Sequence, residues 1–242
     1  MTLASALADA HRTGRPFPAG SVPAPVSFEE AEIVQEEVAG LLGAEVAGWK
    51  VGMAPDGSRP ASAPLFRHLL LEDGGVYAME EATFVAIEVE IGFRLLSEGN
   101  DALHRTLGPA FVGIEVVRSR YTEGPAVPFA SFLADNIANG GYVIGPERPD
   151  WTKLDLAQLR CRVWRDGEIV HDGVGGHPQG HPIVPLKAQW STPPTHLGGF
   201  RSGQIVTTGT LCGVMRIDAP CSIRADVEGF GQVSVSLREG QR

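Results

Sequence analysis

Alternating apolar and polar residues between positions 84 and 96 predict a long β-strand. Its central stretch, "AIEVEIGF" (86–93), places branched apolar residues on one face and Glu88 and Glu90 on the other, because side chains alternate along a strand. Two like charges on one face repel each other, and burial would return a proton to at least one of them unless a cation compensates. This strand is therefore the first candidate for a functional site.

Residues 27–42 show apolar positions at helical intervals. Ser27 and Glu30 stand at capping-box spacing before them, and Gly43 follows as a C-cap, so we predict a helix. "VAGWKVGM" (46–53) reads as a short apolar strand that carries one lysine, Lys50. The composition of residues 57–64 predicts a loop.

The rest of the chain is rich in predicted strands. Residues 110–121 form a strand with one glutamate, Glu115, among apolar residues. The stretch 129–141 is expected to be helical until its glycines at 140 and 141, and strand resumes over 142–145. The later expected elements are a hairpin turning at Asp166-Gly167 and strands over 204–210, 222–227 and 232–237.

These elements predict a β-rich α+β fold. We expect an N-terminal helical segment (1–45) followed by a catalytic domain (46–242), together forming one continuous domain. No internal repeat or low-complexity tract is present in the sequence.

Composition narrows the possible partners. A net charge of −9 and a pI near 5.3 argue against a general nucleic-acid or anionic-membrane surface. No apolar run approaches the ~20 residues of a membrane span, and the N-terminal residues lack the pattern of a signal peptide. Cys161, Cys212 and Cys221 have no CxxC spacing, which suits core residues in a reducing compartment. We expect a cytoplasmic protein with a small-molecule partner or a second subunit.

Two interpretations fit the paired glutamates. In the first, Glu88, Glu90 and Glu115 bind a magnesium, manganese or calcium ion, since these ions prefer oxygen ligands. In the second, the pair faces solvent with Arg94 as an ion partner. Lys50 is equally open: it is either an acid or base with a pKa depressed by an apolar pocket, or a lysine that extends to solvent from a strand end.

Other site classes find little support. His171, His177 and His181 lie in a glycine-rich stretch without the spacing of a helical zinc motif. No G-x-S-x-G serine-hydrolase motif occurs, and neither does a GxGxxG or P-loop nucleotide motif.

Taken together, the ordered motifs resemble the 2-keto-4-pentenoate hydratase family of the fumarylacetoacetate hydrolase superfamily. The resemblance covers most of the chain, and the segments that carry it are "GWKVGM" (48–53), "PLF" (64–66), "AIEVEIGFRL" (86–95), "GIEVVRSRY" (113–121), "ADNIANGGYVIG" (134–145), "GHP" (180–182) and "GQIVTTGT" (203–210).

The resemblance implies a mixed β-roll with flanking helices and a homo-oligomeric enzyme. It implies Mg²⁺ or Mn²⁺ held by Glu88, Glu90 and Glu115, with Lys50 transferring protons. Thr208 and Thr210 fall where the superfamily holds the carboxylate of a 2-oxo or 2-hydroxydienoic acid. The implied reaction is hydration of a 2-hydroxy-2,4-dienoate to a 4-hydroxy-2-oxo acid in the catabolism of aromatic compounds.

Three alternatives remain open. The first is a 4-oxalocrotonate-type decarboxylase, the second an acylpyruvate hydrolase and the third a non-catalytic partner subunit. Hydratases of the family carry an acidic residue just before the "PLF" segment, where this chain has Ala61 and Ser62. Asp73 or Asp135 could replace that acid. Prolines at 185, 193 and 194 also depart from the regular helix expected after "GHP".

Overall fold

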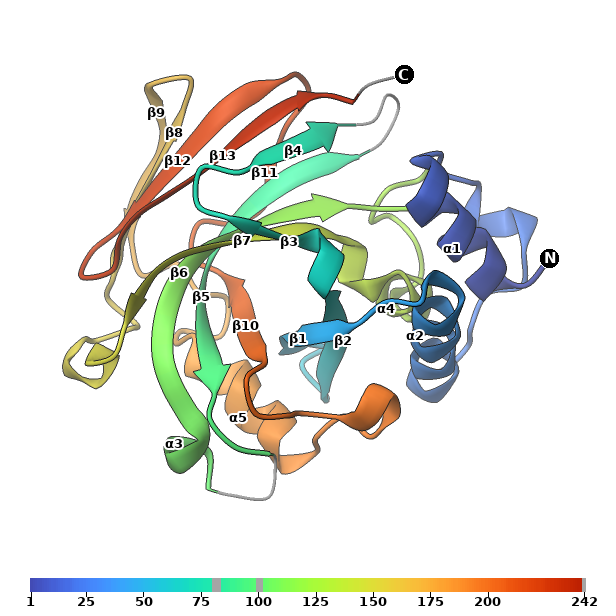
Figure 1. Cartoon of the computed structure of the whole chain (residues 1–242), viewed down its shortest axis with the longest axis horizontal. Helices are drawn as coiled ribbons and strands as arrows, with labels where there is room; N and C mark the ends of the chain where they lie inside the picture. The colour runs from blue at the N-terminus through green and yellow to red at the C-terminus, as the bar shows by residue number, and fades with distance from the viewer. Residues whose placement is uncertain (80–83, 99–101, 241–242) are drawn as a thin grey trace.

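The computed structural model describes residues 1–79, 84–98 and 102–240 and contains two β-sheets with helices around them (Figure 1). The first sheet has the order β2-β1-β10-β5-β6-β7-β3, and β11 pairs with β5. Its strands are β1 (Val46–Met53), β2 (Pro60–Phe66), β3 (Leu70–Glu72), β5 (Val85–Leu95), β6 (Leu107–Arg118), β7 (Asn139–Arg148), β10 (Ile205–Thr210) and β11 (Met215–Arg216).

The second sheet has the order β4-β13-β12-β8-β9. Its strands are β4 (Val76–Met79), β8 (Arg160–Arg165), β9 (Glu168–Val174), β12 (Cys221–Val227) and β13 (Gly231–Glu239). The predicted hairpin joins β8 to β9, and both turn residues, Asp166 and Gly167, have positive φ as a tight two-residue turn requires.

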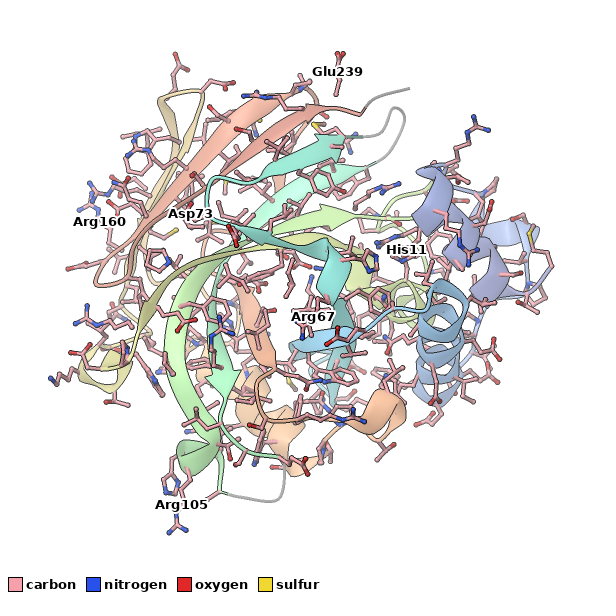
Figure 2. The ribbon with its side chains drawn as sticks, viewed as in Figure 1. His11, Arg67, Asp73, Arg105, Arg160 and Glu239 are labelled. Atoms are coloured by element: carbon pink, nitrogen blue, oxygen red, sulfur yellow. The ribbon has the colours of Figure 1, made fainter. Side chains whose placement is uncertain are left out.

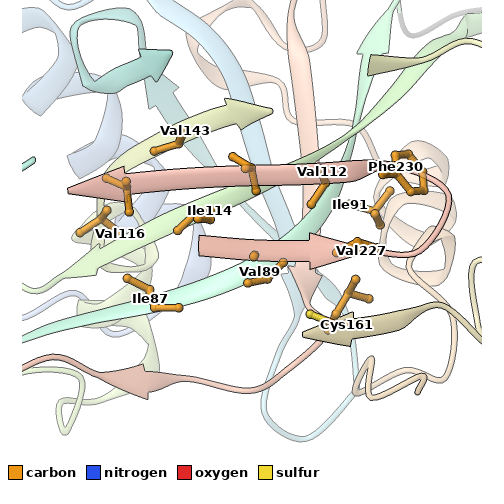
Figure 3. Packing of buried hydrophobic residues seen from close by; sticks show 14 of the residues in the cluster. Ile87, Val89, Ile91, Val112, Ile114, Val116, Val143, Cys161, Val227 and Phe230 are labelled. Atoms are coloured by element: carbon orange, nitrogen blue, oxygen red, sulfur yellow. The ribbon is translucent and has the colours of Figure 1, made fainter. Parts of the chain in front are cut away.

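The first sheet curls into a roll, and its two faces have different roles (Figure 1). The outer face of β5 and β6 packs on the second sheet through a large apolar core, part of which Figure 3 shows. On the inner face, the ring of Tyr142 lies across Gly113 of the neighbouring strand. A Cβ atom at position 113 would lie 2.3 Å from the tyrosine oxygen, so only glycine permits this contact.

The two N-terminal helices pack together with the residues after β6, and they form a smaller apolar cluster of their own. As predicted, Ser27 caps the second helix and Gly43 ends it in the left-handed conformation. The helices are α1 (Leu3–Thr13), α2 (Phe28–Leu42), α3 (Leu103–Thr106), α4 (Phe129–Ala134) and α5 (Ile183–Ser191), with 3-10 turns η1 (Ala19–Ser21), η2 (Arg67–Leu69), η3 (Asn136–Ala138), η4 (Trp151–Lys153) and η5 (His196–Gly198).

Three local predictions were wrong. Much of the predicted loop 57–64 is strand β2, because its small residues pack flat against β1. The predicted helix 129–141 ends at Ala134, where the backbone turns left-handed. Residues 183–191 do form helix α5, since Pro185 lies in its first turn, where no intrahelical N–H bond is lost.

Cys161 and Cys221 are buried as expected, whereas Cys212 is partly exposed. No helix among residues 1–79, 84–98 and 102–240 is long and apolar enough to cross a membrane.

Candidate metal centre

The three predicted glutamates come together on the inner face of the roll. Glu88 pairs directly with Glu115 across β5 and β6, and Glu90 follows two residues along β5 on the same face. Each of the three offers a carboxylate oxygen that lies within 4.8 Å of the other two. Glu90 and Glu115 are fully buried, and Glu88 is 9% exposed, so the cluster borders solvent on one side.

Lys50 reaches this cluster from β1, although β10 lies between β1 and β5. Its Nζ lies 2.6 Å from Oε2 of Glu115 and 3.7 Å from Oε2 of Glu88, and it donates a hydrogen bond to the carbonyl of Ile137 at 3.3 Å. The curl of the sheet makes this reach possible, because it brings the inner faces of β1 and β6 toward each other. The lysine is 7% exposed and therefore does not extend to solvent.

The site is electrostatically strained without a cation. Burial raises the pKa of Glu115 to about 7, although Lys50 acts in the opposite direction, and burial with the charge of Glu115 raises the pKa of Glu90 well above its ordinary value. Burial alone would lower the pKa of Lys50, but the charges of Glu115, Glu88 and Glu90 outweigh it and raise the pKa. The pKa of Lys50 is therefore raised in the metal-free protein, and the depressed pKa expected for a lysine in an apolar pocket near a metal stays a prediction.

A strained loop positions both Lys50 and Glu115. Residues 136–138 all have φ between 51° and 54°, an uncommon conformation for side chains other than glycine. The loop brings the carbonyl of Ile137 to Lys50 and the amide of Asn139 to Oε1 of Glu115 at 2.8 Å.

Arg120 and Asp135 anchor this loop. Asp135 accepts hydrogen bonds from the Arg120 amide and from Ser119, while the Arg120 guanidinium contacts Asp135 at 3.4 Å and donates to the carbonyl of Asn139. His11, which extends from α1 toward the roll (Figure 2), contacts the same guanidinium at 3.3 Å. The N-terminal helix is thus connected to the loop that shapes the site.

The threonine turn is arranged differently from the sequence-based expectation. The Thr208 hydroxyl donates to the carbonyl of Ile91, and the Thr210 hydroxyl donates to the carbonyl of Gly213. The threonine that lies beside Lys50 is Thr207, which pairs with Lys50 across β10 and β1 and lies on the same face of the sheet. The hydroxyls of Thr207 and Tyr142 are buried and make no hydrogen bond of full geometry in the described part of the chain. The substrate-binding role of Thr208 and Thr210 stays a prediction.

Sequence reasoning missed Thr207, Asn139 and Tyr142. The alternation of side chains along a strand could have identified Thr207. Val206 lies in the core between the two sheets, so the next residue, Thr207, points to the opposite face, into the roll, and Thr208 points to the same face as Val206. No comparable signal marks Asn139, because its position depends on the left-handed loop before it.

The donor set fits a hard divalent cation. Three carboxylates converge, and both oxygens of the fully buried Glu90 lack a hydrogen-bond partner among the described residues. An ionised carboxylate in that condition is costly unless a cation compensates it, and oxygen-only donors suit magnesium, manganese or calcium.

The other candidate groups lie in different environments. Within the described ranges, the three glutamates are the only cluster of three or more potential metal-ligating side chains, and His171, His177 and His181 are not part of such a cluster. Asp73 accepts hydrogen bonds from Ser234 in the second sheet (Figure 2). Asp135 is engaged by Arg120, as described above.

Ala61 and Ala63 lie on the face of β2 that matches Lys50 on β1 and are both buried. Ser62, the other residue where the acid was expected, is buried on the opposite face of β2. Neither alanine methyl group can transfer a proton, so no carboxylate replaces that acid within the described strand β2.

No protein-family model matches the chain, but comparisons with individual proteins are informative. It is 26% identical over 218 residues to 2-hydroxyhexa-2,4-dienoate hydratase of Comamonas testosteroni, covering 81% of this chain and 80% of that protein. It is 23% identical over 243 residues to 4-oxalocrotonate decarboxylase of Pseudomonas putida, covering 93% and 89%.

Among solved structures, 4-oxalocrotonate decarboxylase of Pseudomonas putida G7, complexed with magnesium and adipate, superposes with a TM-score of 0.81. That match covers 98% of this chain and 96% of the other at 20% identity, which establishes a common fold. The chain is thus similar over most of its length to hydratases of 2-hydroxydienoates and 2-keto-4-pentenoate, and it shares its fold with a magnesium-complexed decarboxylase.

Proposed function

We propose that the protein is a divalent-metal-dependent hydratase that adds water to a 2-hydroxy-2,4-dienoate, giving a 4-hydroxy-2-oxo acid. The observation that carries this proposal is the convergence of Glu88, Glu90 and Glu115 beside Lys50 on one buried face. Relatives named as hydratases of 2-hydroxydienoates and of 2-keto-4-pentenoate support the choice of reaction.

Glu88, Glu90 and Glu115 are the proposed ligands of Mg²⁺ or Mn²⁺. When bound, the cation would supply Lewis-acid stabilisation of negative charge on a 2-oxo acid and a template for its oxygens. Related solved structures contain magnesium, calcium or manganese, which supports a divalent cation at this site.

Lys50 is the proposed proton-transfer residue. Its Nζ is held between Glu115 and the carbonyl of Ile137, so the ammonium donates from a fixed position toward the interior of the roll. A lysine so close to carboxylates can exchange a proton with a substrate carbon or oxygen placed beside it, and the buried walls limit exchange with solvent. Thr208 and Thr210 remain the proposed contacts to the substrate carboxylate.

Decarboxylation of 4-oxalocrotonate is the second candidate. Two observations favour it: the fold match to a decarboxylase over nearly the whole chain, and the presence of Ala61 and Ser62 where a hydratase acid was expected. We propose a homo-oligomer in either case, on the basis of the family resemblance.

A direct assay separates the two reactions. The Mn²⁺-loaded protein is incubated with 2-hydroxypenta-2,4-dienoate, and loss of the dienol ultraviolet band together with formation of the 4-hydroxy-2-oxo acid is expected. Release of CO₂ from 4-oxalocrotonate without turnover of the dienoate would reverse the order of the two candidates. Glu88→Gln is the matched variant: unchanged metal affinity would remove Glu88 from the proposed ligand set.

A further inference from the structure

Glu90 differs from the other two glutamates in its surroundings. Glu115 accepts a hydrogen bond from Asn139 and contacts Lys50, while Glu88 lies near Lys50 at the solvent edge of the cluster. Glu90 is fully buried, and neither of its oxygens has a hydrogen-bond partner in the ranges that the structure describes. A metal ion would use one oxygen lone pair of a monodentate carboxylate, so the remaining ones still need donors.

The phenol of Tyr142 is the first available donor. Tyr142 pairs with Glu115 across β7 and β6, and its ring extends along the inner face until its oxygen lies over Gly113. Gly113 in turn pairs directly with Glu90. Directly paired residues have Cα atoms roughly 4.5–5.5 Å apart, so the phenol lies beside the Glu90 side chain. The phenol oxygen itself is buried without a partner among the described residues.

The hydroxyl of Thr207 is the second donor, and it approaches from the opposite strand. Thr207 pairs with Gly92 on β5, which makes Glu90 its diagonal neighbour on the same face. The Thr207 side chain is fully buried, and its hydroxyl makes no hydrogen bond of full geometry in the described part of the chain. It is nevertheless close enough to Glu90 to act as a hydrogen-bond donor that lowers the pKa of that carboxyl. Two buried donors and one buried acceptor, none with a hydrogen bond of full geometry among the described residues, therefore meet at one place.

We propose that Tyr142 and Thr207 are positioning residues that donate hydrogen bonds to the Glu90 carboxylate and hold it as a metal ligand, as Asn139 does for Glu115. This inference rests on the proposed metal centre. Both donors favour the ionised form of the carboxylate and fix its orientation, and loss of such outer hydrogen bonds weakens metal binding roughly 10–100-fold. Both roles act through Glu90 and need no contact with the substrate.

Metal affinity tests the proposal without turnover. Calorimetric titration of the full chain with Mn²⁺ is expected to give a Kd about 10–100-fold weaker for Tyr142→Phe, and a weaker Kd for Thr207→Val. Tyr121→Phe is the matched control, because it removes the hydroxyl of another buried tyrosine that packs in the helical cluster. This control is expected to bind Mn²⁺ like the parent protein.

Two further measurements distinguish positioning from a structural role. In a Glu90→Gln background, Tyr142→Phe is expected to weaken binding no further, because the shared partner is already changed. The Tm of the metal-free protein is expected to stay within about 2 °C in Tyr142→Phe, because the hydroxyl has no partner to lose there.

A parent-like Kd for Tyr142→Phe, or an equal loss in Tyr121→Phe, would overturn the proposal. If the parent protein itself binds no Mn²⁺, the metal centre fails and this inference fails with it. A different outcome is a parent protein that binds Mn²⁺ normally and variants that bind it equally well. That result would overturn this inference and leave the proposed metal centre standing.

Discussion

Glu115→Gln should stabilise the metal-free protein, and the gain should grow with pH. In the folded chain the pKa of Glu115 is about 7, against its ordinary 4.5, because burial outweighs the attraction of Lys50. Between these two pH values the folded state keeps a proton that the unfolded state has lost. The stability contributed by this group is therefore fully present below 4.5 and is lost as the pH rises through 7.

The size of the effect follows from the same values. One pKa unit corresponds to roughly 1.4 kcal/mol, so ionised Glu115 costs the metal-free folded state about 3 kcal/mol above pH 8. Glutamine at this position can still accept a hydrogen bond from Asn139 but carries no charge. The variant should match the parent near pH 4.5 and exceed its unfolding free energy by about 3 kcal/mol at pH 8.

Urea unfolding in EDTA, followed by tryptophan fluorescence at several pH values, measures this difference. Subtracting the unfolding free energy of the parent from that of the variant at each pH cancels the contributions common to both, including those of the histidines with lowered pKa values. A difference that stays constant from pH 4.5 to 8, or that shrinks, would refute the reasoning. Saturating Mn²⁺ should reverse the order of stability, because only the parent keeps all three proposed ligands.

Four further outcomes are expected. Lys50→Ala should abolish turnover but leave Mn²⁺ binding intact in a calorimetric titration. Parent Mn²⁺ affinity should rise tenfold or more per pH unit below pH 7, because Glu115 and Glu90, whose pKa values are both raised, must lose their protons to bind, and a flat calorimetric profile would contradict this. Arg120→Met should lower the free energy of urea unfolding by about 3–5 kcal/mol, since it leaves Asp135 buried without its cation. Ala138→Gly should leave the calorimetric Tm within about 2 °C, because relief of roughly 1 kcal/mol of left-handed strain is offset by loss of a fully buried methyl group.

Local periodicity predicted the elements whose two faces differ clearly. The β5 strand, helix α2 with its caps and the β8–β9 hairpin were all predicted correctly, because their patterns depend on near neighbours. The β2 strand was missed, because its serine, alanine and proline residues have low strand propensity and are held by pairing with β1.

The part of the candidate site that could be predicted was the part that residue type alone indicates. Glu88, Glu90 and Glu115 could be named because acidic residues in apolar strands are unusual. The raised pKa of Lys50 could not be foreseen, since it depends on how far the roll brings β1 toward β6. Asn139 depends likewise on the Arg120–Asp135 pair that anchors its loop.

The position of β10 in the first sheet determines when the site can form during synthesis. This strand, Ile205–Thr210, lies between β1 and β5 and pairs in parallel with β1, near the other end of the chain. Until it leaves the ribosome, β1 and β5 have no common neighbour, and Lys50 has no framework that holds it near the three glutamates. Parallel pairings between distant segments form slowly. Metal uptake should therefore be one of the last events in folding, and truncation before Ile205 should abolish the site altogether.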